Sequence, residues 1–325
     1  MIDFEKIIDI IKSSDEVFLT GHKNIDLDAL GSLLGMYYLV NSMGKKAYVV
    51  IDDENKNTEV KRALSTIKRD NNIKTYNYLD IKNVITNDSL LIVTDTSKKN
   101  RLQNEELNKI KNKIILDHHV KTDDNIVNSS YEYIDTSSSS ACEIVLEIIS
   151  KLQIEIPSNV ANIMLSGIYI DTNGFLLKTT EKTHFYTSFL YKFGVDNIEI
   201  QYLLKQNYNE FKRRQNLTLK TEFYDNVAIS SSDSKYSNVE LAKACDVLLT
   251  FNNVEAAFVI AKLDDNLIGI SARSLGNVDV EKVMNYFNGG GHKTDAACQI
   301  KEDNIEKVKD KLLKYLGGLN ESNIY

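Results

Sequence analysis

Imidazoles and carboxylates, the side chains that hold divalent cations, are concentrated in two short segments: His22, Asp26 and Asp28 in the first, and Asp117, His118 and His119 in the second. Each segment follows an apolar run, residues 17–20 and 113–116, that predicts a buried β-strand. Open α/β sheets gather their ligands beyond the carboxyl ends of strands, so both segments can converge on one point. Because two divalent cations roughly 3.5–4 Å apart need several shared ligands, the pattern predicts most of a two-metal hydrolytic site.

Two further aspartates extend this ligand set. Asp95 follows the apolar run 90–94, and Asp171 follows the run 165–170, which we also interpret as a strand. A single aspartate at a strand end is usually a helix cap or a turn residue. Here four such positions occur in order and use three of the five histidines of the chain. The combination therefore favours one shared metal centre over four unrelated turns.

These segments resemble the four motifs of the DHH phosphoesterase superfamily: His22-x3-Asp26-x-Asp28, Asp95-Thr96-Ser97, Asp117-His118-His119, and the run from Gly167 to Thr172. The sequence Gly289-Gly290-Gly291-His292 resembles the signature of the DHH-associated C-terminal domain, and the likeness extends from about residue 15 to about residue 317. The runs 270–276 and 277–280 are most similar to the catalytic part of GdpP-type cyclic-di-AMP phosphodiesterases. The nanoRNase and 3',5'-bisphosphate nucleotidase branch shares every metal motif and is the alternative.

The resemblance implies a role for each residue of the centre. It implies one ion held by His22 and Asp26, a second held by Asp28, His118 and Asp171, and Asp95 bridging both. Asp117 would orient an imidazole and His119 would face the substrate phosphate, so that Asp95, Asp117, His118 and His119 form the catalytic group. Water activated by the two ions would attack phosphorus in line. Oxygen and nitrogen ligands without a thiolate favour Mn²⁺, although Co²⁺ and Fe²⁺ stay possible.

Substrate-binding residues are expected in both halves of the chain. Ser139 and Ser140 end a serine run just before an apolar helical pattern, and we predict a helix N-terminus whose exposed amides suit phosphate. Arg273 offers a planar fork for phosphate. Gly289, Gly290 and Gly291 can bring backbone amides against a ligand, with His292 beside them. By resemblance, the smaller domain would hold the nucleotide over the metals across a cleft.

The elements that position these residues form two α/β domains joined by a helical connector. We predict a metal-binding domain over residues 1–190, a connector over 191–222, and a substrate-binding domain over 223–325. The first domain alternates strand-like and helix-like segments, which indicates a mostly parallel sheet flanked by helices. Within it, residues 29–39 have helical spacing, and Gly31 and Gly35 would let this helix approach the sheet closely. In the second we expect a strand at 226–230, a helix at 240–249, and a hairpin of 256–261 with 267–271.

The net charge limits the kinds of molecule that the chain can bind. With 39 basic and 46 acidic residues the net charge is −7, which argues against long nucleic acid as a partner but permits a small anionic nucleotide bound through metals.

No apolar stretch approaches 18 residues and no signal-peptide pattern is seen, so we expect no membrane segment and a cytoplasmic location. Three dispersed cysteines are expected to be buried free thiols, and His184 to be structural. The oligomeric state stays open, with a homodimer possible.

The function that best fits this pattern is hydrolysis of cyclic di-AMP to linear pApA. The alternative is cleavage of short oligoribonucleotides with removal of phosphate from pAp, which the Asp95-Thr96-Ser97 sequence also fits. GdpP-type proteins often have His-Lys-Pro where this chain has Ser97-Lys98-Lys99. A nucleotide sensor without turnover would have no need of a complete ligand set, and a pyrophosphatase would not need the glycine run with His292.

Overall fold

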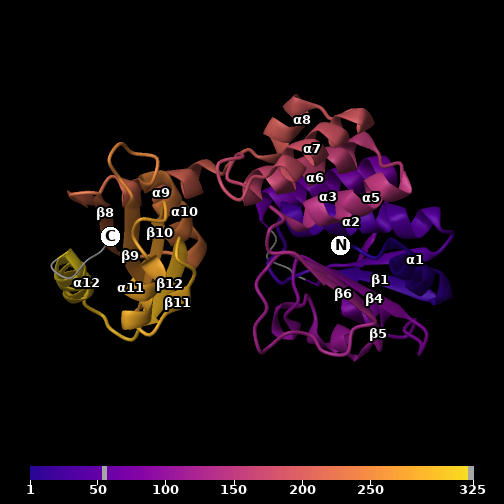
Figure 1. The fold of residues 1–325 in the computed structure, drawn as a ribbon, viewed down its shortest axis with the longest axis horizontal. Helices are drawn as coiled ribbons and strands as arrows, with labels where there is room; N and C mark the ends of the chain where they lie inside the picture. Colours follow the sequence, from indigo (N-terminus) through magenta and orange to yellow (C-terminus); the bar gives the residue numbers. More distant parts are fainter. Residues whose placement is uncertain (53–56, 321–325) are drawn as a thin grey trace. The chain divides into compact units, whose positions relative to one another are not determined.

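The computed structural model describes residues 1–52 and 57–320 (Figure 1). The chain divides into two compact units, Met1–Gln206 and Asn207–Tyr325, which we call unit 1 and unit 2. The division falls inside the range 191–222 that the sequence assigns to a connector. Residues 321–325, at the end of the predicted C-terminal domain, lie outside the described residues. No helix within the described residues is long and apolar enough to cross a membrane.

Unit 1 is built on one parallel sheet, which confirms the predicted fold class. Its strands are β1 (Glu16–Thr20), β2 (Lys46–Val50), β3 (Thr75–Tyr76), β4 (Leu90–Thr94), β5 (Asn112–Asp117) and β6 (Tyr131–Ile134). Their order across the sheet is β3-β2-β1-β4-β5-β6. The order reverses between β1 and β4, and ligands of open α/β sheets bind at this kind of switch point. The segments that follow β1 and β4 are those of His22 and Asp95.

Helices cover this sheet. They are α1 (Phe4–Ser13), α2 (Leu27–Ser42), α3 (Thr58–Asn71), α4 (Tyr78–Ile81), α5 (Ala141–Leu152), α6 (Ser158–Asp171), α7 (Glu181–Leu190) and α8 (Asn197–Leu203), with short 3₁₀ turns η1 (Lys99–Arg101), η2 (Glu105–Lys109) and η3 (Tyr191–Phe193). In Figure 1, α2, α3 and α5 to α8 lie on one side of the sheet. Helix α2 is apolar and buried over most of its surface, as expected for a helix between a sheet and other helices.

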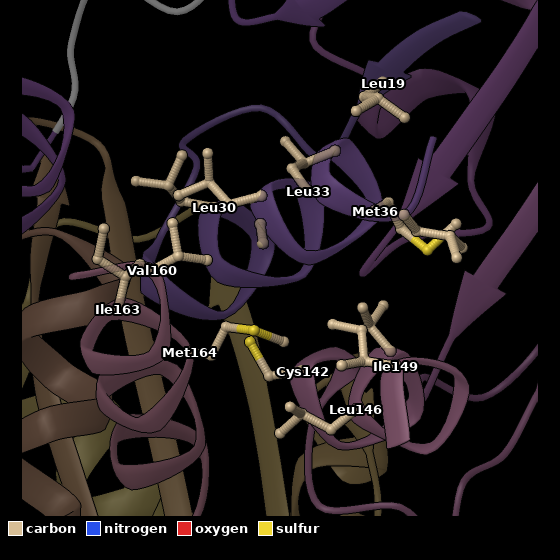
Figure 2. Packing of buried hydrophobic residues seen from close by; sticks show 14 of the residues in the cluster. Leu19, Leu30, Leu33, Met36, Cys142, Leu146, Ile149, Val160, Ile163 and Met164 are labelled. Atoms are coloured by element: carbon tan, nitrogen blue, oxygen red, sulfur yellow. The ribbon is translucent and has the colours of Figure 1, made fainter. Parts of the chain in front are cut away.

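The side chains of the strands alternate between two hydrophobic cores. Val17 and Leu19 of β1 belong to the core that contains α2, α5 and α6, whereas Phe18 between them belongs to the core on the opposite face. Figure 2 shows the first of these cores, with residues of α2, α5 and α6 gathered around one another. Both faces of the sheet are therefore buried, which is why its strands are continuous apolar runs.

Two details of the sequence interpretation are wrong. The run 165–170 before Asp171 lies in helix α6 and not in a strand, because a short apolar run fits a buried helix as well as a buried strand. Gly31 and Gly35 permit close approach of other helices rather than of the sheet. A Cβ atom at Gly31 would lie 2.8 Å from the Cys142 sulfur of α5 and 2.9 Å from the Met164 Cα of α6.

Unit 2 contains a second, mixed sheet. Its elements are α9 (Tyr208–Thr218), β7 (Thr221–Tyr224), β8 (Val227–Lys235), α10 (Asn238–Leu248), β9 (Ala256–Asp264), β10 (Leu267–Ser274), α11 (Val280–Tyr286), β11 (Gly290–Gly291), β12 (Asp295–Ile300) and α12 (Ile305–Asn320). The strand order is β11-β12-β10-β9-β8-β7, and only the β8–β9 pair is parallel. The predicted strand, helix and hairpin of this half are confirmed.

Candidate metal centre

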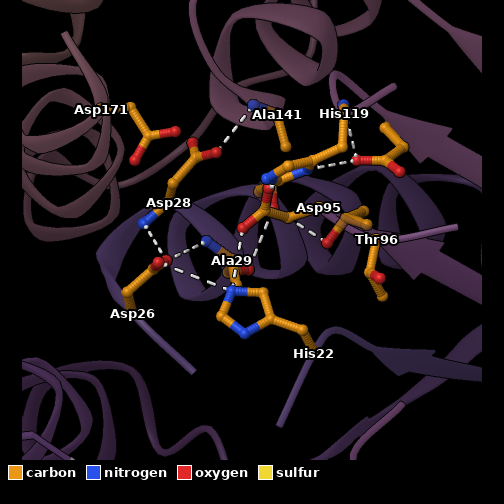
Figure 3. Close-up of polar contacts among 12 residues, drawn as sticks. His22, Asp26, Asp28, Ala29, Asp95, Thr96, His119, Ala141 and Asp171 are labelled. Atoms are coloured by element: carbon orange, nitrogen blue, oxygen red, sulfur yellow. Dashed lines mark hydrogen bonds and ion pairs between the residues drawn. The ribbon is translucent and has the colours of Figure 1, made fainter. Parts of the chain in front are cut away.

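The predicted ligands of unit 1 meet at the carboxyl edge of the sheet, and Figure 3 shows five of them side by side: His22, Asp26, Asp28, Asp95 and Asp171. They come from five elements: His22 follows β1, Asp26 caps α2 and Asp28 begins it, Asp95 follows β4, His118 follows β5, and Asp171 ends α6. Among the described residues, three groups of side chains bring ligand atoms within 4.8 Å of one another, and the third of these groups joins Asp95 and His118 to His119. Two of these groups correspond to the two ligand sets that the sequence implies, and both lie beside Asp95.

The first group contains His22, Asp26 and Asp95. The Nε2 atom of His22 lies 3.1 Å from Oδ2 of Asp95 and 3.5 Å from Oδ2 of Asp26. Its Nδ1 atom lies 2.6 Å from the carbonyl oxygen of Lys23, which can only accept a hydrogen bond. Nδ1 therefore carries a proton and Nε2 is the atom that faces the carboxylates, as a metal-binding imidazole requires.

The second group contains Asp28, His118 and Asp171, again beside Asp95. The Nε2 atom of His118 lies 3.2 Å from Oδ1 of Asp95, 3.3 Å from Oδ2 of Asp171 and 3.9 Å from Oδ2 of Asp28. Among the described residues, His118 Nε2 and Asp95 Oδ1 are buried atoms without a hydrogen-bond partner. Ligands at 2.0–2.1 Å from an octahedral ion are about 3 Å apart, so these unpartnered atoms fit a divalent cation.

Asp95 faces the imidazoles of both groups through different oxygens, and its backbone is unusual. Its φ of 61° lies in the left-handed region, which aspartate and asparagine adopt more readily than most residues. The Asp95 amide donates to the carbonyl of Leu116 at 3.0 Å, which ties this residue to the end of β5. The turn after β4 thus holds one buried carboxylate between two imidazoles.

Burial and the neighbouring charges shift the pKa of several of these side chains. Burial disfavours the charged forms of His22 and His118, but the neighbouring carboxylates outweigh burial and raise the pKa of His22 to about 11 and that of His118 to about 10. Burial also opposes ionisation of Asp95, yet the two imidazoles keep its pKa well below the ordinary value. Burial and the charge of Asp95 raise the pKa of Asp28 to about 6. The cluster therefore attracts cations strongly, and metal binding releases protons from it.

Asp117 and His119 form a pair beside this cluster. The carboxylate oxygen Oδ1 of Asp117 accepts from the His119 backbone amide at 3.1 Å and lies 2.8 Å from His119 Nδ1. Asp117 is fully buried, whereas the His119 side chain is 43% exposed. The imidazole that Asp117 holds is therefore that of His119, which is also the more accessible of the two adjacent histidines.

The phosphate-binding role predicted for Ser139 and Ser140 is wrong. Ser140 does cap α5, as predicted, by accepting from the amide of Glu143 at 3.1 Å. Both serines are completely buried, however, and the hydroxyl of Ser139 donates to the Glu143 carboxylate at 2.6 Å. The amides at this helix start are not exposed to a ligand, because the carboxylate of Asp28 already occupies them.

The predicted substrate-binding residues of unit 2 lie on β10 and around β11. Arg273 places Nε 3.2 Å from Oδ1 of Asp246 on α10, and its Nη1 donates to the carbonyl of Ala272 at 3.0 Å. Gly289 and Gly291 are needed for packing, since a Cβ at either position would overlap β12. Gly290 has open space around it instead. His292 is exposed, and its amide donates to the carbonyl of Asp295 at 2.7 Å.

Three supports of the centre were not found by sequence reasoning. The amides of Ala141 and Cys142 hold Asp28, and Gly167 lets α6 approach it: a Cβ at Gly167 would lie 2.7 Å from the Asp28 Cα. The buried Gln103 side chain donates to the His22 carbonyl and accepts from the amide of Asp52. Only Gly167 belongs to a recognisable motif. The other contacts join segments distant in sequence and leave no local pattern.

Comparison with known proteins identifies the class that this fold and site define. Residues 16–168 match the model of the DHH family, N-terminal domain, and residues 224–318 match that of the DHHA1 domain. The chain belongs to the DHH phosphoesterase family and carries a DHH domain followed by a DHHA1 domain. Each matched range lies within one structural unit.

Individual relatives refine this placement. The chain is 34% identical to the cyclic-di-AMP phosphodiesterase PdeA of Listeria monocytogenes over 94% of its own length, and it spans 48% of that protein. It is 26% identical to the bifunctional oligoribonuclease and PAP phosphatase NrnA of Mycoplasma genitalium, covering 93% of both chains. An exopolyphosphatase-related protein from Bacteroides fragilis has the same fold, with a TM-score of 0.78, 20% identity, and coverage of 98% of this chain and 97% of that one.

Proposed function

We propose that this chain is a metal-dependent phosphodiesterase that opens cyclic di-AMP to linear pApA. The observation that carries the proposal is a pair of ligand groups on either side of Asp95, which belongs to the first group and lies 3.2 Å from His118 of the second, with buried atoms of Asp95 and His118 left without hydrogen-bond partners. Likeness to the Listeria phosphodiesterase over 94% of the chain supports the choice of substrate.

In this proposal each ligand group holds one divalent cation, and Asp95 contacts both. When bound, two such ions would activate a water molecule and neutralise the charge that develops on the phosphoryl oxygens. The donor set consists of imidazole nitrogens and carboxylate oxygens without a thiolate, and this combination of ligand types favours Mn²⁺. Cys142, Cys245 and Cys298, which are free and buried thiols, take no part in it.

Residues of the chain itself would bind and orient the phosphate. Asp117 fixes the ring of His119, so that this exposed imidazole would face a phosphoryl oxygen without first losing rotational freedom. The planar guanidinium of Arg273 in unit 2 can donate parallel hydrogen bonds to two oxygens of a phosphate group. His292 and Gly290 in unit 2 would contact the nucleotide as well.

A second candidate activity is degradation of short oligoribonucleotides together with removal of phosphate from pAp. The similarity to NrnA across 93% of both chains favours it, as does the Asp95-Thr96-Ser97 sequence. A cyclic dinucleotide has no terminal phosphate, so a site adapted to it would not depend on a 5' or 3' end. The two activities therefore differ in which substrate has the higher kcat/KM.

Product analysis separates the two. Cyclic di-AMP, pApA and pAp are each incubated with the Mn²⁺-loaded chain, and products are followed from the first turnover. We expect the highest kcat/KM for cyclic di-AMP, with early accumulation of pApA; a tenfold preference corresponds to about 1.4 kcal/mol. His184→Ala, at an exposed histidine outside the ligand groups, serves as the control and should keep full activity. Formation of AMP without a pApA phase, or preference for pAp, would establish the second activity instead.

A further inference from the structure

Asp28 is held by the helix that follows it far along the chain. The amide of Ala141 donates to its Oδ2 at 2.7 Å, and the amide of Cys142 donates to its Oδ1 at 2.8 Å. Both oxygens of this buried carboxylate thus have a backbone donor, and Figure 3 shows the side chain directed at Ala141. Sequence position alone gives no reason to expect this contact.

These bonds make Asp28 a cap of α5. A helix leaves its first amides without partners inside the helix. In α5 the amides of Ala141 and Cys142 are satisfied by Asp28, and the amide of Glu143 by the hydroxyl of Ser140. The partial positive charge at the start of this 12-residue helix adds to the attraction for the carboxylate.

The same carboxylate also faces the imidazole of the second ligand group. Its Oδ2 lies 3.9 Å from His118 Nε2, which is 6% exposed as a residue and has no hydrogen-bond partner. Each carboxylate oxygen can accept about two hydrogen bonds or ligand contacts. The amides use one position on each oxygen, and Oδ2 is the oxygen that lies near His118 of the second ligand group.

The start of α5 is itself fixed. The Glu143 carboxylate accepts from the Ser139 hydroxyl at 2.6 Å and from the Thr183 hydroxyl of α7 at 2.7 Å. All three residues are buried. A displacement of the α5 amides would break these bonds, so α5 presents its two donors in one orientation.

We propose that the N-terminus of α5 is a positioning device that fixes Asp28 as a one-oxygen ligand of the ion shared with His118 and Asp171. The inference rests on the proposed function only in that this group holds a divalent cation. In this arrangement two backbone amides orient the Asp28 carboxylate, as hydrogen-bond partners of metal ligands commonly do.

The test removes one donor without changing a side chain. Replacement of the residue by its hydroxy acid, Ala141→lactic acid, converts the amide into an ester and deletes the N–H that bonds Asp28. Mn²⁺ binding is then measured by titration calorimetry and by metal content after dialysis. We expect one of the two ions to bind about 10–100-fold more weakly, the range seen when a hydrogen-bond partner of a ligand is lost, while the ion at His22 and Asp26 keeps its affinity. Ala242→lactic acid, in α10 of unit 2, is the matched control.

The outcomes are distinguishable. Unchanged or tighter binding of both ions in the Ala141 ester would overturn the positioning role. Failure of the unaltered chain to bind a second ion would overturn the proposed metal centre instead. If the ester variant does not fold, hydrogen exchange in the unaltered chain decides the matter: slow exchange at the Ala141 and Cys142 amides supports the inference, and exchange at the rate of an open loop contradicts it.

Discussion

At the scale of residues, the centre depends on Asp95. Its two oxygens point to different imidazoles, with Oδ2 3.1 Å from His22 and Oδ1 3.2 Å from His118. Its backbone is left-handed, a conformation that asparagine also tolerates. Asparagine at this position therefore keeps the turn and the side-chain volume but removes the negative charge and one of the two acceptor oxygens.

We predict that Asp95→Asn lowers turnover by more than about a hundredfold while the fold is retained, by analogy with the losses that follow weakened ligand support. The measurement is kcat at saturating Mn²⁺, with circular dichroism and thermal melting to verify the fold. Asp88→Asn, at an exposed position in the turn before β4, is the control. Near-normal turnover of Asp95→Asn would exclude a bridging role.

At the scale of elements, the centre depends on how closely α6 crosses α2. Gly167 on α6 faces the backbone of α2, and an added Cβ would lie 2.7 Å from the Cα of Asp28 and 2.8 Å from the carbonyl oxygen of Leu27. Neither neighbour is a flexible side chain. Any substituent at Gly167 therefore moves the backbone that carries Asp28, or moves Asp171 at the end of α6.

We predict that Gly167→Ala lowers the free energy of unfolding by about 1–3 kcal/mol, the usual cost of overpacking a core, and weakens Mn²⁺ binding at the same time. Denaturant unfolding and metal titration measure the two effects. Gly317→Ala, in α12, has no atom within 4 Å of the added Cβ and should be neutral or slightly stabilising. Normal metal affinity in a destabilised Gly167→Ala protein would show that the close crossing serves packing alone.

At the scale of the whole molecule, we propose that one unit holds the metal ions and that residues of the other recognise the nucleotide. The ligand groups lie entirely in unit 1, whereas Arg273 and His292 belong to unit 2, which has hydrophobic cores of its own. Because the units have separate cores, replacing a side chain in one unit should leave the structure of the other unit unchanged. Changes in unit 2 should therefore affect nucleotide binding without affecting the metals.

We predict that Arg273→Ala and His292→Ala each raise KM for the nucleotide while two metal ions stay bound per chain. Metal content and steady-state kinetics measure these quantities separately. Lys235→Ala, which also removes one positive charge from unit 2 at an ion pair with Asp264, is the control and should alter neither. Loss of a metal ion from the Arg273 or the His292 variant would mean that the roles of the two units have been assigned incorrectly.

The sequence by itself determined the ligand types, their order and the parallel sheet. His22, Asp95 and His118 each lie within two residues of the end of a strand, and the carboxyl ends of parallel strands necessarily share one edge. The alternation of strand-like and helix-like runs in unit 1, and the hairpin of unit 2, are equally local patterns. Local periodicity and strand ends are properties of consecutive residues, so they can be recognised without a structure.

Only the tertiary structure decided how the ligands are held. Asp171 ends a helix rather than a strand, since an apolar run fits either element and packing against α2 selects the helix. Ser139 and Ser140 precede two amides, those of Ala141 and Cys142. Both amides donate to the carboxylate of Asp28, which comes from a distant segment, and they are therefore not available to phosphate. Gly31 and Gly167 allow close contact with neighbouring helices, and these helices also come from distant parts of the sequence. These contacts join residues far apart in the chain, and their partners are chosen by packing, for which no local pattern exists.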